Sequence, residues 1–566
     1  MCGITGILKL NRDNNKTISN YLNLMKHRGP DASGIFADEH GGIGVNRLWV
    51  RGAETVNLPQ RITINGKISY AVINGQIYGD AVGLEEIFSI ASDFRPSSCM
   101  YAFASYAPEE RTITLKRDFF GIKPLYYKVG NSFTFSSEIP PLICENSTIN
   151  QKKAFETIAL GTSLDNDTIY NNIKSVPRNG LIEAHQHKGS ICLSEKFFPL
   201  ESPKKYTFEE VKKFVREKIR KSIISCLDSN KTIGLAISGG LDSNILAFEL
   251  NDMGVENIET ISLKIEDSAD GITDLKNLGL PKKGAWKKWK HHHQTFNSHD
   301  FPKYLETISS KAILPHRMSS FPMYYKLAEL AKENNISVLL SGEGADEIFL
   351  GYNSYKRWIK RINQNLSIHK NLKDFILPND LSDTLKQISD KDFLSSLDDS
   401  IEKFLLKIQN KNILSSLISL EAYFSLEPLL IRTDHCLMQN SIEGRFPFLD
   451  TELYSAIIDN PELTLFDGET SKPLLREIYS DFFNSYNIPK IAFRAPLSSW
   501  IGNQLNQWAI NSLKENQELL SKFGFTYNGI TLIINQIKNK NPSVYTLAFS
   551  LISFAYILQN KPLAIL

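Results

Sequence analysis

Residues 232–243 read TIGLAISGGLDS and decide the fold of the larger part of this 566-residue chain. The segment TIGLAI is short and apolar, as buried strands are, and a helical pattern follows SGGLDS. A glycine-rich turn between a buried strand and a helix points backbone N–H groups at one spot beside the helix N-terminus. Phosphate is the usual occupant of such a spot. Taken alone, the segment is also compatible with an ordinary glycine turn that caps a helix.

A second segment of the same design is ISVLLSGEGADE at 336–347. Apolar strands that alternate with helices predict a parallel sheet with helices on both faces, and carboxylates crowded at the ends of such strands mark ligand sites. The first loop lacks the Gly-Lys-Ser/Thr ending of a Walker loop. Asp242 in that loop would repel phosphate unless Mg²⁺ lay between them, which makes Asp242 a candidate metal ligand.

The region before these segments has a different character. Short β-branched and aromatic runs broken by turns, such as KISYAVIN at 67–74 and RTITLK at 111–116, predict a strand-rich unit. The pattern changes at 195–208, where two prolines and several lysines indicate a connection, and helical periodicity dominates from there on, as in 209–226. We therefore expect two domains, 1–200 and 205–566.

Composition excludes several classes of protein. The 64 Lys+Arg and 62 Asp+Glu residues leave a formal net charge of +2, which argues against a general nucleic-acid binder. The six cysteines are scattered without metal-ligand spacing, so a zinc site or a disulfide framework is not expected. The longest apolar run, 544–558, is too short and too interrupted to cross a bilayer and predicts a buried C-terminal helix. Without a signal-peptide pattern, a cytoplasmic protein is expected.

Several motifs, taken together, carry a resemblance to a known family. SGGLDS and the later SGEGADEIFLGY look like the ATP-pyrophosphatase synthetase domain of the asparagine synthetase family, and the chain's first half resembles that family's class II glutaminase domain. The N-terminal motifs are MCGI at 1–4, HRGPDASG at 27–34, NRL at 46–48, NGQIY at 74–78, RDFFGIKPLYY at 117–127 and FSSEI at 135–139. The C-terminal motifs are RTDHCLMQNSIEGRFPFLD at 432–450 and KPLLR at 472–476.

This resemblance implies an α/β protein with an N-terminal Ntn-hydrolase αββα sandwich and a C-terminal doubly wound parallel-sheet ATP-pyrophosphatase domain with extra helices. In the first unit, Cys2 would be an N-terminal nucleophile once Met1 is removed, with the free α-amino group as its base. Asn74 and Gly75 match the oxyanion hole. Arg47 and Gln76 match the residues that bind the substrate glutamine.

In the second unit, the resemblance implies that ATP activates an acceptor carboxylate as an acyl-adenylate, which ammonia then attacks. Asp242 and Asp346 would hold Mg²⁺ against the pyrophosphate. Glu343 matches the acid that accepts a proton from ammonia, and Lys490 matches the lysine that stabilises adenylation. The residues that would bind ATP are Ser238, Gly239, Gly240, Asp242, Ser243, Ser341 and Gly342.

The chain departs from the family's pattern in the glutaminase half. Position 76 is glutamine where the family usually has glutamate, a carboxylate near the α-amino group of the substrate. The stretch after Tyr78 is shortened, and Asp93 is the only remaining candidate for a second acid that meets this group. Glutamine binding is then weaker or different, or the glutaminase half is vestigial. The nucleophile, its oxyanion hole and Arg47 are all present, which favours a working glutaminase.

The acceptor side departs as well. In the segment 313–324, His316 and Arg317 replace small or acidic residues of the family, which puts free aspartate as the acceptor in doubt. The loop at 281–293, PKKGAWKKWKHHH, interleaves basic and aromatic residues. Such a loop is either a mobile, solvated segment or a docking site for an anionic partner.

Three functional hypotheses follow. The first is glutamine- and ATP-dependent amidation of a carboxylate, either aspartate or a specialised biosynthetic acid, with no nucleic-acid or membrane partner and with a possible homodimer. The second is a β-lactam-synthetase-like ligase that uses an amine other than glutamine-derived ammonia; Gln76 favours it and Cys2 opposes it. The third is a non-catalytic scaffold on a decayed fold, which the complete acidic loops oppose.

Overall fold

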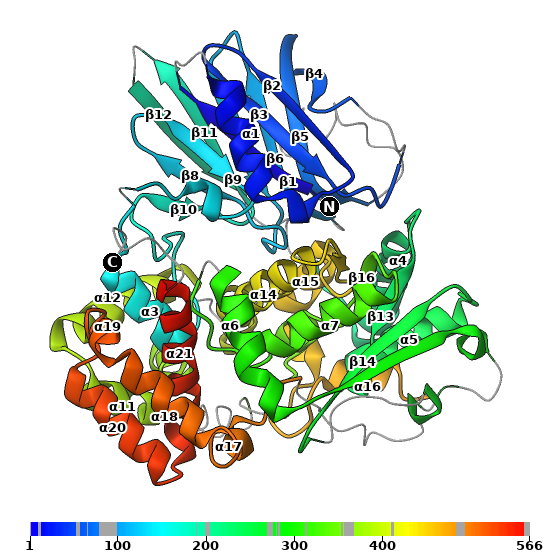
Figure 1. Cartoon of the computed structure of the whole chain (residues 1–566). Coiled ribbons are helices and arrows are strands. Elements are labelled where there is room, and N and C mark those ends of the chain that lie inside the picture. Colours follow the sequence, from blue (N-terminus) through cyan, green and yellow to red (C-terminus); the bar gives the residue numbers. More distant parts are fainter. Residues whose placement is uncertain are drawn as a thin grey trace.

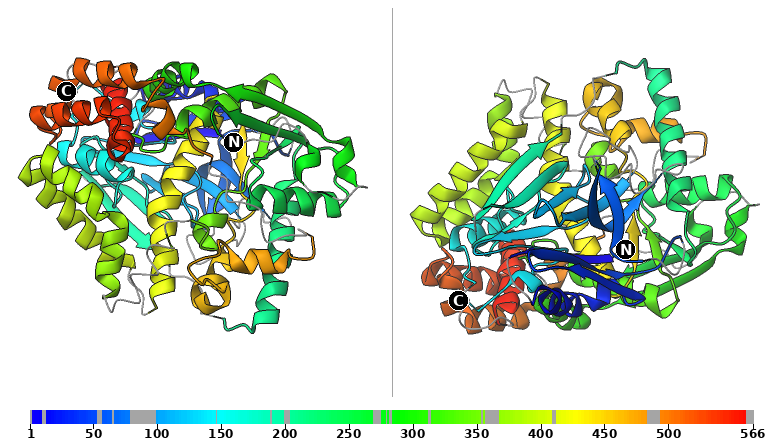
Figure 2. Two further views of the ribbon diagram at one scale, coloured as in Figure 1. Left: turned by 90° about the horizontal axis from the view of Figure 1, so that it is seen from below. Right: turned by 90° about the horizontal axis from the view of Figure 1, so that it is seen from above.

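The computed structural model describes residues 2–9, 13–52, 57–64, 66–78, 99–145, 147–187, 190–198, 204–268, 275–278, 280, 284–311, 314–352, 355, 367–408, 412–482 and 493–559. Figure 1 shows strands of the N-terminal part above a larger C-terminal part made of helices and one parallel sheet. Seen from above, the blue and cyan strands lie over the C-terminal part (Figure 2).

The N-terminal part holds two six-stranded antiparallel sheets. In spatial order, the first contains β10 (Ile173–Ser175), β8 (Tyr126–Val129), β9 (Phe133–Ser136), β1 (Cys2–Leu8), β3 (Gly41–Arg47) and β2 (Ala32–Ala37). The second contains β12 (Ser190–Phe197), β11 (Gly180–His187), β7 (Thr112–Arg117), β6 (Cys99–Ala107), β5 (Lys67–Ile77) and β4 (Gln60–Ile64).

The two sheets pack face to face as the expected sandwich requires. Inward-facing residues of both sheets, among them Ile4, Val72 and Leu115, form one buried core. Helix α1 (Asn14–Leu24) packs against β1 and β3 and buries Ile18 and Leu22 over the outer face of the first sheet. Alternation of buried and exposed side chains along strands is what makes such a two-sheet core possible.

The C-terminal part is built on a five-stranded sheet whose neighbours are all parallel. Its order is β15 (Lys290–Phe296), β14 (Glu259–Ile265), β13 (Ile233–Ala236), β16 (Val338–Leu340) and β17 (Glu443–Arg445). The chain proceeds from β13 towards one edge and from β16 towards the other, so the order reverses between these two strands. Ligands of doubly wound sheets bind at this kind of reversal. The predicted strands at 232–237 and 336–340 are therefore confirmed as its two central members.

Helices fill the rest of the C-terminal part, and α5 and α7 pack directly on the parallel sheet. Their bounds, with those of the other α-helices after residue 200, are α4 (Phe208–Cys226), α5 (Leu241–Asp252), α6 (Phe301–Lys311), α7 (Phe321–Glu333), α8 (Ala345–Ile348), α10 (Ile368–Ile376), α11 (Asn379–Ile388), α12 (Lys391–Ile408), α13 (Ile413–Leu420), α14 (Leu426–Met438), α15 (Thr451–Asp459), α16 (Pro473–Ile478), α17 (Leu497–Trp500), α18 (Asn506–Glu515), α19 (Gln517–Ser521), α20 (Tyr527–Lys538) and α21 (Tyr545–Gln559).

One helix of the N-terminal sequence lies in the C-terminal part. Helix α3 (Gln151–Leu160) packs against α12 and α21, and Figure 1 shows it among those helices rather than beside the N-terminal sheets. The Phe155 ring lies 5.6 Å from that of Phe393 and 4.9 Å from that of Phe525, between ring centroids. The two parts therefore share a core.

The basic segment 281–293 was expected to be a mobile, solvated loop or a docking site. The expectation of a loop was wrong for residues 290–293, which belong to a strand. Residues 281–283 lie outside the described residues, but Lys290 begins β15, at the edge of the parallel sheet. His292 Nε2 lies 2.8 Å from Glu259 Oε2 and His291 Nδ1 lies 2.9 Å from Thr260 Oγ1, so both rings are engaged by the neighbouring strand. An exposed edge strand carries charged residues and therefore resembles a loop in sequence.

The apolar C-terminal run forms α21 and is buried, as predicted. By length and hydropathy, the stretches Ile413–Met438 and Pro542–Gln559 would each suffice to cross a membrane, so the expectation that the C-terminal run is too short to do so was wrong. Of their most apolar windows, 56% and 72% are buried inside the protein, which is the behaviour of core helices.

Candidate active sites

Cys2 opens β1 at the end of the first sheet and is half-buried. Its backbone N–H donates to Asn74 Oδ1 at 3.1 Å, which joins the first sheet to β5 of the second. Arg47 lies opposite Cys2 because β1 and β3 are paired in that register. The structure thus brings together the three residues to which the sequence assigned the nucleophile, an oxyanion donor and the glutamine-binding arginine.

Burial raises the pKa of the Cys2 thiol above its ordinary value, although the chain's amino terminus and the backbone N–H of Leu48 act in the opposite direction. A thiol with a raised pKa is a poor nucleophile until a base takes its proton. This site consequently needs such a base within reach of the sulfur.

Two polar groups beside Cys2 have unused hydrogen-bonding capacity. Asn74 is fully buried, and its Nδ2 has no hydrogen-bond partner among the described residues. Gln76 lies on the same face of β5, and its buried Oε1 also lacks a partner within the described ranges. Gly75 between them has φ 129°, and a side chain there would collide with the Met100 carbonyl. An unpaired buried donor beside a nucleophile is what an oxyanion hole offers.

The glycine loop after β13 forms the predicted turn into α5. Gly239 has φ 81°, in the left-handed region that glycine tolerates. Ser238 N–H donates to Ser243 Oγ at 3.3 Å, and Gly240 N–H donates to Ser238 Oγ at 3.3 Å. No side chain caps α5, which begins at Leu241. The first-turn N–H groups of such a helix are available to an anion.

The loop after β16 lies against this turn. The Cβ of a residue larger than glycine at position 342 would lie 2.8 Å from Asp242 Cβ. Tyr324 OH donates to Ser341 Oγ at 3.4 Å, and Ser341 N–H donates to the Arg445 carbonyl at 3.0 Å. The close approach of the two loops places Asp242 and Asp346 at one site.

A lysine stands between these two aspartates. Lys472 Nζ bonds Asp242 Oδ1 and lies 2.8 Å from Asp346 Oδ1, while the whole lysine is only 3% exposed. Burial opposes its charge, but the two carboxylates prevail and raise the pKa of Lys472. The sequence quoted Lys472 as the first residue of KPLLR without giving it a role.

The donor set suits the predicted Mg²⁺. Two carboxylates that already surround a positive charge are hard oxygen ligands, and Mg²⁺ typically takes one or two such groups together with substrate phosphates and water. Within the described ranges no group of three or more His, Cys, Asp or Glu residues could hold a metal.

Glu343 is held by two residues of α14. Thr433 Oγ1 donates to Glu343 Oε2 at 2.7 Å, and the Arg432 guanidinium forms a charge pair with the same carboxylate. Arg432 also donates to Ser320 Oγ at 2.7 Å and lies 4.4 Å from the Tyr324 ring centroid. Sequence reasoning missed both Arg432 and Thr433, although they open the quoted motif at 432–450.

Some candidates fall elsewhere. Lys490 and Asp93 lie outside the described residues. Arg317 donates to the Ala159 carbonyl at the end of α3, so its guanidinium bonds the backbone of that helix. His316 is buried against Phe321, with 3.5 Å between ring centroids.

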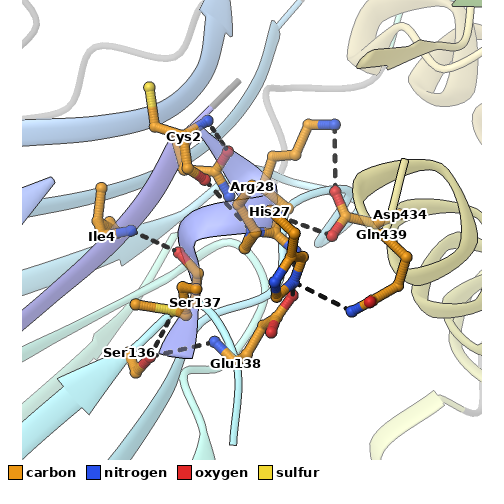
Figure 3. A network of polar contacts seen from close by, with 12 residues as sticks. Cys2, Ile4, His27, Arg28, Ser136, Ser137, Glu138, Asp434 and Gln439 are labelled. Carbon is orange, nitrogen blue, oxygen red and sulfur yellow. Dashed lines mark hydrogen bonds and ion pairs between the residues drawn. The ribbon is translucent and has the colours of Figure 1, made fainter. Parts of the chain in front are cut away.

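A polar network joins the two parts of the chain beside Cys2 (Figure 3). Arg28, at the end of a short 3₁₀ turn (Lys26–Arg28), is 1% exposed; it donates to Glu138 Oε1 at 3.0 Å and to Asp434 Oδ2 at 2.8 Å. Its Nε also donates to the Cys2 carbonyl at 3.3 Å. Lys123 adds an ion pair to Asp434 at 3.5 Å. Sequence reasoning did not identify this network.

A cysteine beside a buried amide whose Nδ2 has no partner among the described residues, and a phosphate-type loop with an acidic pair, are the features of an ATP-dependent amidotransferase with two centres. The sequence model of the asparagine synthase family matches residues 214–534, and that of the glutamine amidotransferase domain matches residues 1–98 and 91–197. The chain belongs to the asparagine synthase family. It is a carbon–nitrogen ligase that takes nitrogen from glutamine and is driven by ATP.

Curated relatives span nearly the same length. Asparagine synthetase [glutamine-hydrolyzing] 1 of Bacillus subtilis is 25% identical, over 91% of this chain and 90% of its own. Putative asparagine synthetase [glutamine-hydrolyzing] 1 of Methanocaldococcus jannaschii is 25% identical, over 81% of each chain. Asparagine synthetase B of Escherichia coli is 24% identical, over 93% of this chain and 88% of its own. These matches do not favour the β-lactam-synthetase-like alternative.

One solved structure, an allosteric regulatory enzyme of purine biosynthesis, is 12% identical. It covers 60% of this chain and 81% of its own at a TM-score of 0.26, which is too low to establish a shared fold.

Proposed function

We propose that the chain amidates a carboxylic acid in two units, 1–200 and 205–566, with ammonia passing from the first to the second. One observation carries the proposal. Arg28 contacts both the Cys2 carbonyl and Asp434, and Asp434 follows directly after the α14 residues that hold Glu343. The two chemical centres therefore lie on either side of one buried contact.

At the first centre, the proposed steps begin with removal of Met1. The α-amino group of Cys2 takes the thiol proton, and the thiolate attacks the side-chain carbon of glutamine. The Asn74 Nδ2–H and the Gly75 N–H stabilise the oxyanion, ammonia leaves with that proton, and water releases glutamate from the thioester. Arg47 and Gln76 hold the α-carboxylate and α-amino ends of the substrate.

At the second centre, the acceptor carboxylate attacks the α-phosphorus of ATP, and pyrophosphate leaves. Ammonia then attacks the acyl-adenylate, AMP leaves, and Glu343 accepts the proton that the nitrogen loses. Mg²⁺ held by Asp242 and Asp346 would neutralise phosphate charge, and Lys490 would stabilise adenylation. The proposed ATP-binding residues are Ser238, Gly239, Gly240, Asp242, Ser243, Ser341 and Gly342.

Aspartate is the first acceptor to test. The doubt about it came from His316 and Arg317, but Arg317 bonds α3 and His316 packs on Phe321. A specialised acid remains the second candidate, and a screen of pyrophosphate release over carboxylic acids, with glutamine or ammonium as donor, decides between them.

The decisive variant is Cys2→Ala. We expect it to abolish glutamate release and glutamine-driven pyrophosphate release while ammonium-driven release continues, because only the first centre loses its nucleophile. Cys144→Ala, which changes an exposed free thiol, is the matched control. Glutamate release at the parent rate by Cys2→Ala would show that the nucleophile is wrongly assigned.

We propose a cytoplasmic setting because all six cysteines are free thiols and the nucleophile must stay reduced. The possible homodimer rests on the resemblance alone, and analytical ultracentrifugation tests it.

A further inference from the structure

A small cavity lies where the two parts of the chain meet. Its volume is about 20 Å³, enough for one molecule the size of water. The N-terminal part contributes Arg28, Ser137 and Glu138 to its wall, and the C-terminal part contributes His316, Asp434 and His435. Polar groups thus face the cavity from both parts.

The cavity lies between the two chemical centres. On one side Arg28 contacts the Cys2 carbonyl, and Ser137 Oγ accepts from the backbone N–H of Ile4 in the same strand as Cys2. On the other side Asp434 and His435 follow the two α14 residues that hold Glu343. The cavity wall is therefore linked by single contacts to Cys2 on one side and by chain neighbours to the residues that hold Glu343 on the other.

Two histidines in the wall each have a ring nitrogen without a hydrogen-bond partner among the described residues. His316 and His435 are each 7% exposed, and they flank Phe321, with ring centroids 3.5 Å and 5.9 Å from it. The Nε2 atom of each is buried and has no hydrogen-bond partner in the part of the chain that the structure describes. Glu138 and Asp434, by contrast, each form an ion pair with Arg28, and Asp434 Oδ1 also lies 3.5 Å from Lys123 Nζ.

Both imidazoles are neutral near pH 7. Burial lowers the pKa of His435 to about 4, against the opposing charge of Glu138, and burial together with the charges of His435 and Arg432 lowers the pKa of His316 well below its ordinary value. A neutral imidazole offers one N–H donor and one acceptor. Ammonia has three N–H groups and a lone pair, so it can bond to both kinds of group.

We propose that this cavity is a holding site for ammonia and that His316 and His435 are the residues that bind it there. Uncharged imidazoles do not protonate ammonia to ammonium, which lacks the lone pair needed to attack the acyl-adenylate. The inference rests on the proposed transfer from Cys2 to Glu343 and adds two positioning residues to it.

The test measures how tightly glutamate release is coupled to pyrophosphate release, rather than the rate of either. With saturating glutamine, ATP and the acid that supports pyrophosphate release, we compare His435→Met with His435→Gln, and His316→Met with His316→Gln. Methionine and glutamine have similar length, but only glutamine keeps a donor and an acceptor. We expect each methionine variant to raise the ratio of glutamate to pyrophosphate at least threefold and each glutamine variant to stay within twofold of the parent.

Ammonium-driven pyrophosphate release should stay within twofold of the parent in all four variants, because external ammonium reaches the second centre without this site. His299→Met, at an exposed histidine, should leave the ratio unchanged. A parental ratio in the methionine variants would overturn the proposal, and if the variants at one histidine fail to fold, the pair at the other decides. Absence of Cys2-dependent glutamate release in the parent would instead refute the proposed function.

Discussion

At the scale of single residues, Gln76 is the clearest departure from the family's pattern, and the structure gives it a consequence. Its Oε1 is buried without a partner among the described residues, on the same side of β5 as Asn74. An amide oxygen accepts a hydrogen bond from the ammonium group of glutamine without neutralising its charge, whereas a carboxylate accepts the same hydrogen bond and forms an ion pair as well.

Gln76→Glu should therefore lower the KM for glutamine by about tenfold, since replacing the neutral acceptor with a charged one adds roughly 1.4 kcal/mol of binding free energy. Initial rates of glutamate release over a range of glutamine concentrations measure it. Gln294→Glu, on the exposed strand β15, is the control and should change nothing. An unchanged KM in Gln76→Glu would mean that this side chain does not face the substrate.

Lys472 offers a second test at this scale. Lys472→Met removes the ammonium that lies between Asp242 and Asp346, and breaking a buried charge pair typically costs about 3–5 kcal/mol. We expect a lower urea midpoint than in the parent and a larger recovery on adding Mg²⁺. Lys472→Arg keeps the charge and should lose less. Equal Mg²⁺ effects in parent and methionine variant would contradict the shared site.

Sequence could predict the residues of these sites but not their partners. Cys2, Asn74 and Asp242 could be proposed as site residues because each lies in a short motif that resembles the family's pattern. Lys472 lies 230 positions from Asp242, and no local pattern states that its ammonium reaches that carboxylate. Contacts of this kind depend on tertiary packing.

At the scale of elements, apolar runs predicted the central strands because both faces of a parallel sheet are buried. The edge strand β15 was not predicted because its Lys and His residues are partly solvated, so its sequence lacks the apolar run of a buried strand. Helix α3 escaped for a different reason. Eight of its residues, Lys153 to Leu160, are buried, and its partners lie more than 200 positions away in sequence.

Phe155→Ala tests this packing. Removing a fully packed phenylalanine typically costs about 3–5 kcal/mol, and here the loss falls on contacts with Phe393 and Phe525. We expect a lower free energy of unfolding by urea denaturation. Leu24→Ala, at a leucine of α1 that is 57% exposed, should shift it by less than about 0.5 kcal/mol. Equal losses in both variants would argue against a shared core.

At the scale of the whole molecule, near-neutral charge excluded broad electrostatic binding but did not show where charges meet. The structure places Arg28, Lys123, Glu138 and Asp434 in one buried network between the parts. Because these charges come from distant segments, their pairing could not be inferred from composition.

This interface predicts how stability depends on pH. Burial lowers the pKa of His435 to about 4 from 6.5, so the unfolded chain binds its proton first as the pH falls. We expect stability to fall between pH 6.5 and 4, by up to roughly 3 kcal/mol from this group. The free energy of unfolding, measured by urea titration at each pH, should change less over this range in His435→Gln than in the parent. The same pH dependence in both proteins would show that a group other than His435 determines it.

Glu138 acts in a lower window. His27 and Arg28 outweigh the effect of burial and hold its pKa at about 2, so its stabilising contribution is present above pH 4.5 and is lost as the pH falls towards 2. Glu138→Gln should reduce stability at pH 7 and weaken the acid dependence below pH 4.5. If the free energy of unfolding of Glu138→Gln, measured by urea titration, falls below pH 4.5 as steeply as that of the parent, Glu138 is not the group responsible.

Helix α3 also limits how such a protein can exchange parts by recombination. A crossover near residue 200, in the connection that looks like a natural joint, would bring a foreign α3 into a resident core formed with α12 and α21. The incoming helix would have to match Phe393 and Phe525 as well as its own sheets. We therefore expect a replacement of residues 1–200 to be tolerated only with a compensating change in the helices that contact α3.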